Sequence, residues 1–104
     1  MARKHSYEIS FLAKQDLEEI WNYTILEWSV AQANAYYQLI FGEIDAICLN
    51  PFASKSIPQI NSIHRIRPIK SHIIIYKIVG QHVYIDRILH QKMDIQHQII
   101  EPED

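Results

Sequence analysis

Apolar residues in the first part of the chain recur every three or four positions. Because an α-helix turns once every 3.6 residues or so, this spacing places them on one side of a helix. Polar residues such as Lys14, Glu18 and Asn22 fall largely elsewhere. We interpret Trp21 and Trp28 as core residues of the apolar side, with base stacking as the alternative. The series that predicts the helix is Ala13, Leu17, Ile20, Trp21, Thr24 and Trp28.

A second helix is predicted to follow directly. The string Ser29-Val30-Ala31-Gln32 fits a capping box, in which the serine hydroxyl accepts a hydrogen bond from the glutamine amide. Asn50-Pro51 marks the end of the helix, since a residue before proline disfavours helical geometry. The short connection between the two helices predicts a helical hairpin, with Cys48 as a small core residue. Its apolar side comprises Ala33, Tyr37, Ile40, Ile44, Ile47 and Cys48.

Shorter patterns on either side of the helices predict strands. Residues 7–10 alternate apolar and polar and predict a short opening strand. Residues 51–62 are rich in Pro, Ser and Asn and predict a loop. Residues 72–78 and 83–89 predict two strands joined through Gly80-Gln81.

Another short strand is predicted directly after the loop. Arg65 and Arg67 lie two positions apart and therefore share one face, while Ile66 lies on the other. We expect Pro68 to end the pairing, because proline has no N–H to donate to a neighbouring strand.

The predicted fold class is α+β. A short N-terminal strand precedes a helical hairpin, which packs on a mainly antiparallel sheet of three to four strands. Residues 73–76 place apolar side chains on both faces of their strand, which is typical of a strand covered on both sides. The hairpin covers only one face, so we hypothesise that another protein covers some of the remaining apolar surface.

Composition favours one domain. A chain of 104 residues with 48% hydrophobic content has enough apolar residues for one core. We expect a single domain over residues 1–104, with its core at about 7–94 and an acidic tail at 95–104. The chain shows neither a signal-peptide apolar region nor a run that spans a bilayer, and its one cysteine excludes an internal disulfide. These features favour a soluble protein of the cytoplasm.

Charge is distributed unevenly along the chain. Residues 55–93 carry seven Lys and Arg and one acid, Asp86, hence a net charge of +6, while the whole chain has −2. A basic face indicates contact with a negatively charged partner, with an ordinary solvated face as the alternative. The basic residues are Lys55, Arg65, Arg67, Lys70, Lys77, Arg87 and Lys92.

One string near the end of the chain carries a family resemblance. The order of elements, followed by Arg87-Ile88-Leu89-His90-Gln91-Lys92-Met93-Asp94, resembles the ParE branch of the ParE/RelE superfamily over residues 7–94. The family often has a glycine before Arg65, where this chain has Ile63-His64, so the pose of Arg65 is left open. Further matching features are Ala13, Asp16-Leu17, Ile20, Trp28, Asn50-Pro51, Arg65 and His72-Ile73-Ile74-Ile75-Tyr76.

The resemblance implies a toxin that is neutralised by a cognate antitoxin, ParD-like or similar, in a hetero-oligomer. ParE-like members are associated with poisoning of DNA gyrase, whereas RelE-like relatives cut mRNA at the ribosome. We therefore expect a toxin that binds gyrase and is not an enzyme. The alternatives are a ribosome-dependent mRNA endonuclease and an inactive remnant that binds only its antitoxin.

Candidate contacts with gyrase or the antitoxin lie in the basic segment: Arg65, Arg67, His72, Arg87 and His90. The structural alternative for Arg87 is an ion pair, although Asp86 points to the opposite face of the strand and is not the expected partner. For His72 and His90 the alternative is a packed, hydrogen-bonded side chain. We expect no catalytic residue, cofactor or metal, because the six histidines form no short Cys/His cluster and no Gly-rich phosphate loop is present. An acidic chain end also disfavours RNA as a substrate.

Overall fold

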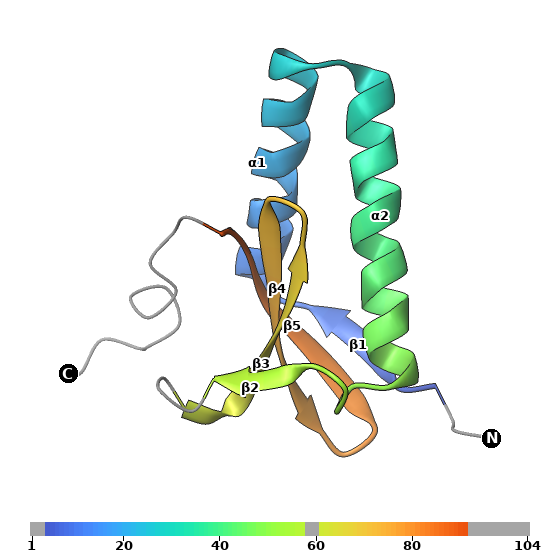
Figure 1. The fold of residues 1–104 in the computed structure, drawn as a ribbon, viewed down its shortest axis with the longest axis vertical. Helices are drawn as coiled ribbons and strands as arrows, with labels where there is room; N and C mark the ends of the chain where they lie inside the picture. The colour runs from blue at the N-terminus through green and yellow to red at the C-terminus, as the bar shows by residue number, and fades with distance from the viewer. Residues whose placement is uncertain (1–3, 58–60, 92–104) are drawn as a thin grey trace.

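The structure, a computed structural model, describes residues 4–57 and 61–91. The predicted opening strand, helical hairpin and C-terminal sheet are all present, so the α+β fold class is confirmed (Figure 1). Residues 95–104, predicted to form an acidic tail, lie outside the described residues. The elements are β1 (Ser6–Ile9), α1 (Phe11–Glu27), α2 (Val30–Leu49), β2 (Lys55–Ile57), β3 (Asn61–Ile69), β4 (His72–Val79) and β5 (His82–His90).

The strands form one sheet in the order β1-β5-β4-β3-β2. β1 pairs parallel with β5, and the other neighbours are antiparallel. The helices stand side by side along one face of this sheet, and their connected ends extend beyond the β3–β4 turn (Figure 1). Within the described residues, neither helix is long and apolar enough to cross a bilayer.

Both helices begin at a serine cap. Ser10 Oγ accepts a hydrogen bond of 3.0 Å from the Ala13 amide, and Ser29 Oγ accepts one of the same length from the Gln32 amide. The second contact confirms the predicted start of α2, and its end at Asn50 confirms the boundary set by Pro51. Each cap satisfies an amide that has no partner inside its own helix.

The predicted loop after α2 contains an additional strand. β2 has three residues and pairs with β3, with a register shift between Ser56 and Ile57. Three residues are too few to show an alternating pattern, which explains why the sequence indicated a loop here. In the described residues the sheet therefore has five strands, the opening strand β1 and four that follow the hairpin.

Pro68 lies within β3, so the expectation that it ends the pairing is wrong. It stands opposite Ile73 of β4. In an antiparallel pair only alternate residues exchange hydrogen bonds, and the proline occupies a position that faces away from β4. On its other side the β2 pairing reaches only as far as Ile66, so β2 does not require an N–H from Pro68.

The core lies between the helices and the sheet. Ile74 and Tyr76 of β4 pack there against α1 and α2, together with Cys48, which confirms the core role of that cysteine. Ile73 and Ile75 lie on the other face of β4 in a smaller cluster with Ile66 and Leu89. Both faces of β4 are therefore apolar, as predicted.

The structure narrows one expectation about apolar residues and contradicts another. Ile73, Ile75 and Leu89 are each at most 4% exposed within the chain itself, so the second face of the sheet leaves little apolar surface there for a partner. Trp28 was expected in the core, yet it caps the end of α1 and is 72% exposed. The helical period continued to Trp28, but this end of the hairpin extends past the described strands (Figure 1), so the sheet does not cover Trp28 there. Trp21 is half-buried and packs edge-on against Tyr37.

Candidate functional site

A cleft of about 820 Å³ lies between the helical hairpin and the adjoining ends of β4 and β5. Its polar wall comes from both layers, and its apolar wall comes mainly from the helices. Polar side chains in the cleft include Asp16, Tyr36, His72, Arg87 and His90, and apolar ones include Ile20, Tyr23, Trp28 and Leu39. A concave site with an apolar wall and a few polar groups is typical of a binding site.

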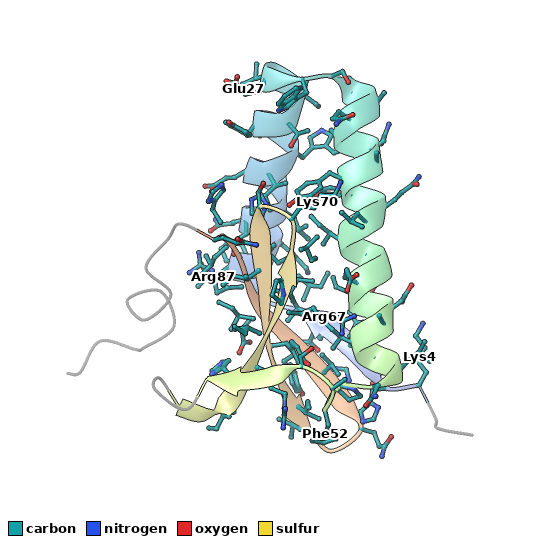
Figure 2. All side chains as sticks on the ribbon, in the orientation of Figure 1. Lys4, Glu27, Phe52, Arg67, Lys70 and Arg87 are labelled. Atoms are coloured by element: carbon teal, nitrogen blue, oxygen red, sulfur yellow. The ribbon has the colours of Figure 1, made fainter. Side chains whose placement is uncertain are left out.

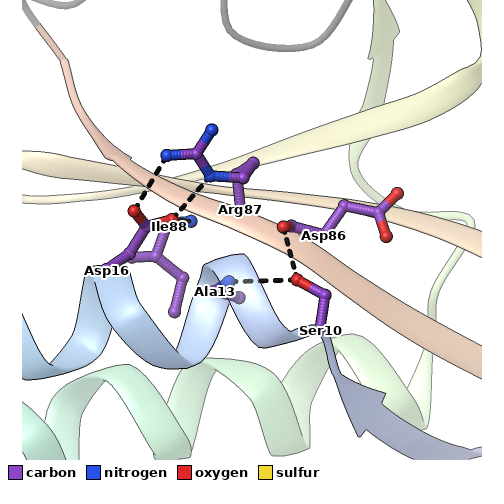
Figure 3. Close-up of polar contacts among 6 residues, drawn as sticks. All are labelled: Ser10, Ala13, Asp16, Asp86, Arg87 and Ile88. Carbon is purple, nitrogen blue, oxygen red and sulfur yellow. Dashed lines mark hydrogen bonds and ion pairs between the residues drawn. The ribbon is translucent and has the colours of Figure 1, made fainter. Parts of the chain in front are cut away.

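Asp16 and Arg87 form a two-pronged ion pair at one side of the cleft. Arg87 Nε donates to Asp16 Oδ2 at 2.8 Å, and Arg87 Nη2 donates to Asp16 Oδ1 at 2.9 Å (Figure 3). Asp16 Oδ2 also accepts a hydrogen bond of 3.0 Å from the Ile88 amide. The hydrogen bonds to Asp16 raise the pKa of Arg87, against an opposing effect of burial. The ion pair predicted as the structural alternative for Arg87 is therefore present, with Asp16 as the partner.

Ser10 fastens the start of α1 to the same strand. Its hydroxyl donates to the Asp86 carbonyl at 2.7 Å while accepting from the Ala13 amide (Figure 3). β1 pairs with β5 only as far as Ile85. Side chains of Ser10 and Asp16 thus continue along the edge of β5 where β1 ends, and they hold the cleft wall in place.

His72 lies in the cleft with a tyrosine as its partner. Its Nδ1 is 2.6 Å from the Tyr36 hydroxyl, and that hydroxyl also donates to the Ile69 carbonyl at 3.3 Å. Burial lowers the pKa of His72 to about 4, aided by repulsion from His90 and opposed by Asp16. His72 is therefore neutral at pH 7, as a packed and hydrogen-bonded histidine should be.

His90 stands directly opposite His72 at the end of β5. The two residues are paired across the antiparallel strands, and their ring centroids are 5.3 Å apart in an edge-on arrangement. His90 itself is exposed. The structure thus brings His72, Arg87 and His90 together in one cleft.

Arg65 and Arg67 belong to a different part of the molecule. Arg65 Nη1 donates to the Ser54 carbonyl at 2.6 Å, and its guanidinium lies 5.2 Å from the centre of the Phe52 ring. Arg67 Nε donates to Glu43 of α2 at 2.8 Å. Figure 2 shows Arg67 beside α2 and Arg87 apart from it. The five sequence candidates therefore form two groups and do not share one open basic surface.

Asp16, Tyr23 and Tyr36 line the cleft but were not among the site candidates, although Asp16 was one of the matching family features. Asp16 falls on the buried side of α1, between Ala13 and Ile20 in the helical series, and a carboxylate at such a position signals a buried partner. Tyr36 and Tyr23 gave no signal, because their place in the cleft depends on how the hairpin is set against the sheet.

The sequence matches a known family over most of its length. Residues 7–95 match the family described as the ParE toxin of the type II toxin–antitoxin system ParDE. A relative named Toxin ParE1 from Mycobacterium tuberculosis is 32% identical over 94 residues, covering 89% of this chain and 96% of the relative. Another Toxin ParE1, from Caulobacter vibrioides, is 34% identical over 88 residues, covering 85% of this chain and 91% of the relative.

Solved structures also resemble this fold. The chromosomal ParDE toxin–antitoxin system from P. aeruginosa aligns with a TM-score of 0.73 at 16% identity, covering 84% of this chain and 96% of that one. The toxin–antitoxin complex RelBE2 from Mycobacterium tuberculosis aligns with a TM-score of 0.59 at 15% identity, covering 86% of this chain and 100% of that one. At such low identities the likeness concerns the fold alone.

Proposed function

Because this chain belongs to the ParE toxin family of type II toxin–antitoxin systems, we propose that it acts by binding DNA gyrase and that a cognate antitoxin neutralises it. Family membership supports a toxin. The contacts of the basic residues favour binding over catalysis.

The observation that favours binding is that three arginines of the basic segment already form hydrogen bonds or ion pairs with other parts of the chain. Cleavage of RNA requires groups that activate the 2′-hydroxyl, stabilise the charged phosphorane and protonate the leaving oxygen at one point. Arg65 is held by the Ser54 carbonyl, Arg67 by Glu43, and Arg87 by Asp16. These contacts fix the arginines as parts of the fold, which suits a preformed docking surface better than a reaction centre.

The cleft is the proposed docking site for a segment of the antitoxin. Trp28 and Tyr23 give it an exposed aromatic wall, because they line the cleft and are 72% and 63% exposed. Large exposed apolar groups at the edge of a cleft are typical of protein interaction sites. His72, Arg87 and His90 are the polar contacts proposed within this site. The resulting assembly is a hetero-oligomer of toxin and antitoxin.

The surface around Arg65, Arg67 and Phe52 is the proposed gyrase contact. Phe52 is 62% exposed, with the Arg65 guanidinium stacked against it. Arginine and aromatic side chains dominate the binding energy of many protein interfaces. Arg67 lies on the same strand two residues away and extends this surface towards α2.

Two substitutions separate these roles. Trp28→Ala should weaken antitoxin binding and leave gyrase inhibition intact, because Trp28 lines only the cleft. Phe52→Ala should weaken gyrase inhibition and leave antitoxin binding intact. Binding of each variant to the antitoxin and inhibition of gyrase supercoiling are measured on the same preparations. If each substitution affects both activities equally, the assignment of two surfaces is wrong.

The class of activity is tested by expressing the chain without its antitoxin and assaying the purified protein twice. One assay measures DNA supercoiling by gyrase, and the other measures cleavage of mRNA on translating ribosomes. Inhibited supercoiling with intact mRNA supports the proposal. Cut mRNA with normal supercoiling identifies an endonuclease, and normal growth with neither effect identifies an inactive remnant.

A further inference from the structure

Two histidines from neighbouring strands meet at the wall of the cleft. His72 opens β4 and His90 closes β5, and the antiparallel register sets them directly opposite each other. Directly opposed side chains on an antiparallel pair have their Cβ atoms about 5 Å apart, close enough for both to reach one small ligand. Eighteen positions separate the two residues in the chain, so the pair appears only once the strands are aligned.

The separation of the rings fits a shared metal ion. A zinc–nitrogen bond of about 2.1 Å puts the metal roughly 3.2 Å from the centre of an imidazole ring. Two such rings at a tetrahedral angle therefore have centres about 5.2 Å apart. The centroids of His72 and His90 are 5.3 Å apart with the rings inclined at 75°.

Tyr36 orients one of the rings. Its hydroxyl lies 2.6 Å from His72 Nδ1 and 3.3 Å from the Ile69 carbonyl, so Tyr36 engages Nδ1 of His72 in either tautomer of the ring. When Nδ1 carries the proton and donates it to the Tyr36 oxygen, the other ring nitrogen, Nε2, has the lone pair that a metal ion requires. Metal-bound histidines characteristically donate their second ring nitrogen to a neighbouring oxygen, which fixes both tautomer and orientation.

The cleft around the two histidines has free volume and is lined by both acidic and basic side chains. The cleft has room for water molecules to complete a coordination shell. Asp16 and Glu19 of α1 line it, as do the cations Lys70 and Arg87. Arg87 is paired with Asp16, so those two charges largely compensate each other. Among the described residues no group of three His, Cys, Asp or Glu side chains is placed to hold a metal, so the site offers two protein ligands.

We propose that His72 and His90 form a two-histidine site for a divalent transition metal ion of the zinc class. Imidazole ligands suit zinc, copper and nickel, whereas calcium and magnesium prefer oxygen. Water or a side chain from a bound partner completes the coordination. The proposal concerns residues of this chain alone and does not depend on gyrase being the target.

The test measures zinc binding to the untagged full-length chain by calorimetry, with Zn²⁺ itself as the probe. His90→Gln removes an exposed ligand without disturbing the core, and should weaken binding at least about tenfold. Tyr36→Phe keeps both ligands and removes only the orienting hydroxyl, and should weaken binding by about tenfold. His82→Gln is the matched control, because it removes a histidine of the same strand outside the cleft and should leave binding unchanged.

NMR of the imidazole protons provides a second measurement on the wild-type chain. Zinc should shift the signals of His72 and His90 and leave that of His82 in place. The proposal is overturned if the wild type binds no zinc, or if His90→Gln binds it as well as the wild type does. It is also overturned if His82→Gln alone abolishes binding, since the metal would then lie elsewhere.

Discussion

Asp16 makes contacts of two kinds with the end of β5. It pairs with the Arg87 guanidinium, and it accepts a hydrogen bond from the Ile88 amide. The Asp16 side chain is only 10% exposed, so its charge depends on these partners in place of water. One residue of α1 thereby sets the position of the strand that carries the cleft wall.

Replacing Asp16 should therefore destabilise the fold. Asp16→Ala leaves Arg87 without its carboxylate and the Ile88 amide without an acceptor, which should cost roughly 2–4 kcal/mol. Glu43→Ala is the control, because the Arg67–Glu43 pair is more exposed and should contribute under about 1 kcal/mol. Urea unfolding of both variants measures the difference. Equal losses of unfolding free energy would contradict the role given to Asp16.

His72 should make stability depend on pH. Its pKa is lowered from 6.5 to about 4 in the folded chain, so the unfolded chain takes up a proton first as the pH falls. Stability is fully present above about pH 6.5 and declines as the pH falls towards 4. The His72 ring is only half-buried, and His90 and Asp16 shift its pKa in opposite directions. We therefore expect the free energy of unfolding to fall by about 1 kcal/mol.

The measurement compares the wild type with His72→Gln in urea at pH 7 and pH 5, with a chelator present. The variant should lose less stability than the wild type between these two values. If both chains lose the same amount, the folded-state pKa of His72 is not depressed.

At the scale of elements, the helices could be predicted well from the sequence and the strands less well. The helical period and the serine cap of α2 depend on neighbouring residues, so Ser29 and Pro51 marked the limits of α2 closely. β2 and the continuation of β3 through Pro68 depend on which strand lies alongside, and this is decided by residues far away in the chain. The cleft was not predictable for the same reason, since Tyr36, His72 and His90 come from three separate elements.

The two glycines should respond to alanine in opposite ways. Gly42 lies exposed inside α2 with no atom within 4 Å of an added Cβ, so Gly42→Ala should stabilise by about 0.5–1 kcal/mol. Gly80 has a φ of +61° in the β4–β5 turn, where a side chain is strained, so Gly80→Ala should cost about 1 kcal/mol. Thermal unfolding of the two variants checks both signs. A shift of the same sign in both would contradict the turn geometry or the helical placement.

At the scale of the whole molecule, the basic segment is integrated into the fold. Its arginines bind Ser54, Glu43 and Asp16, and Lys77 lies 3.8 Å from Asp86. The net positive charge of residues 55–93 indicated a negatively charged partner. It gave no information on these internal contacts of the arginines, whose partners come from α1, α2 and the loop after α2. What the molecule presents to a partner is therefore a cleft with an aromatic wall and, separately, the stacked Phe52 and Arg65.

We propose that this chain inhibits gyrase by binding it and not by catalysis. The most direct measurement is a titration of the purified toxin against a fixed amount of gyrase in a supercoiling assay. A binder should reduce activity in proportion to the toxin added, until the two are present in comparable amounts. Full supercoiling activity at a large excess of folded toxin would contradict the claim.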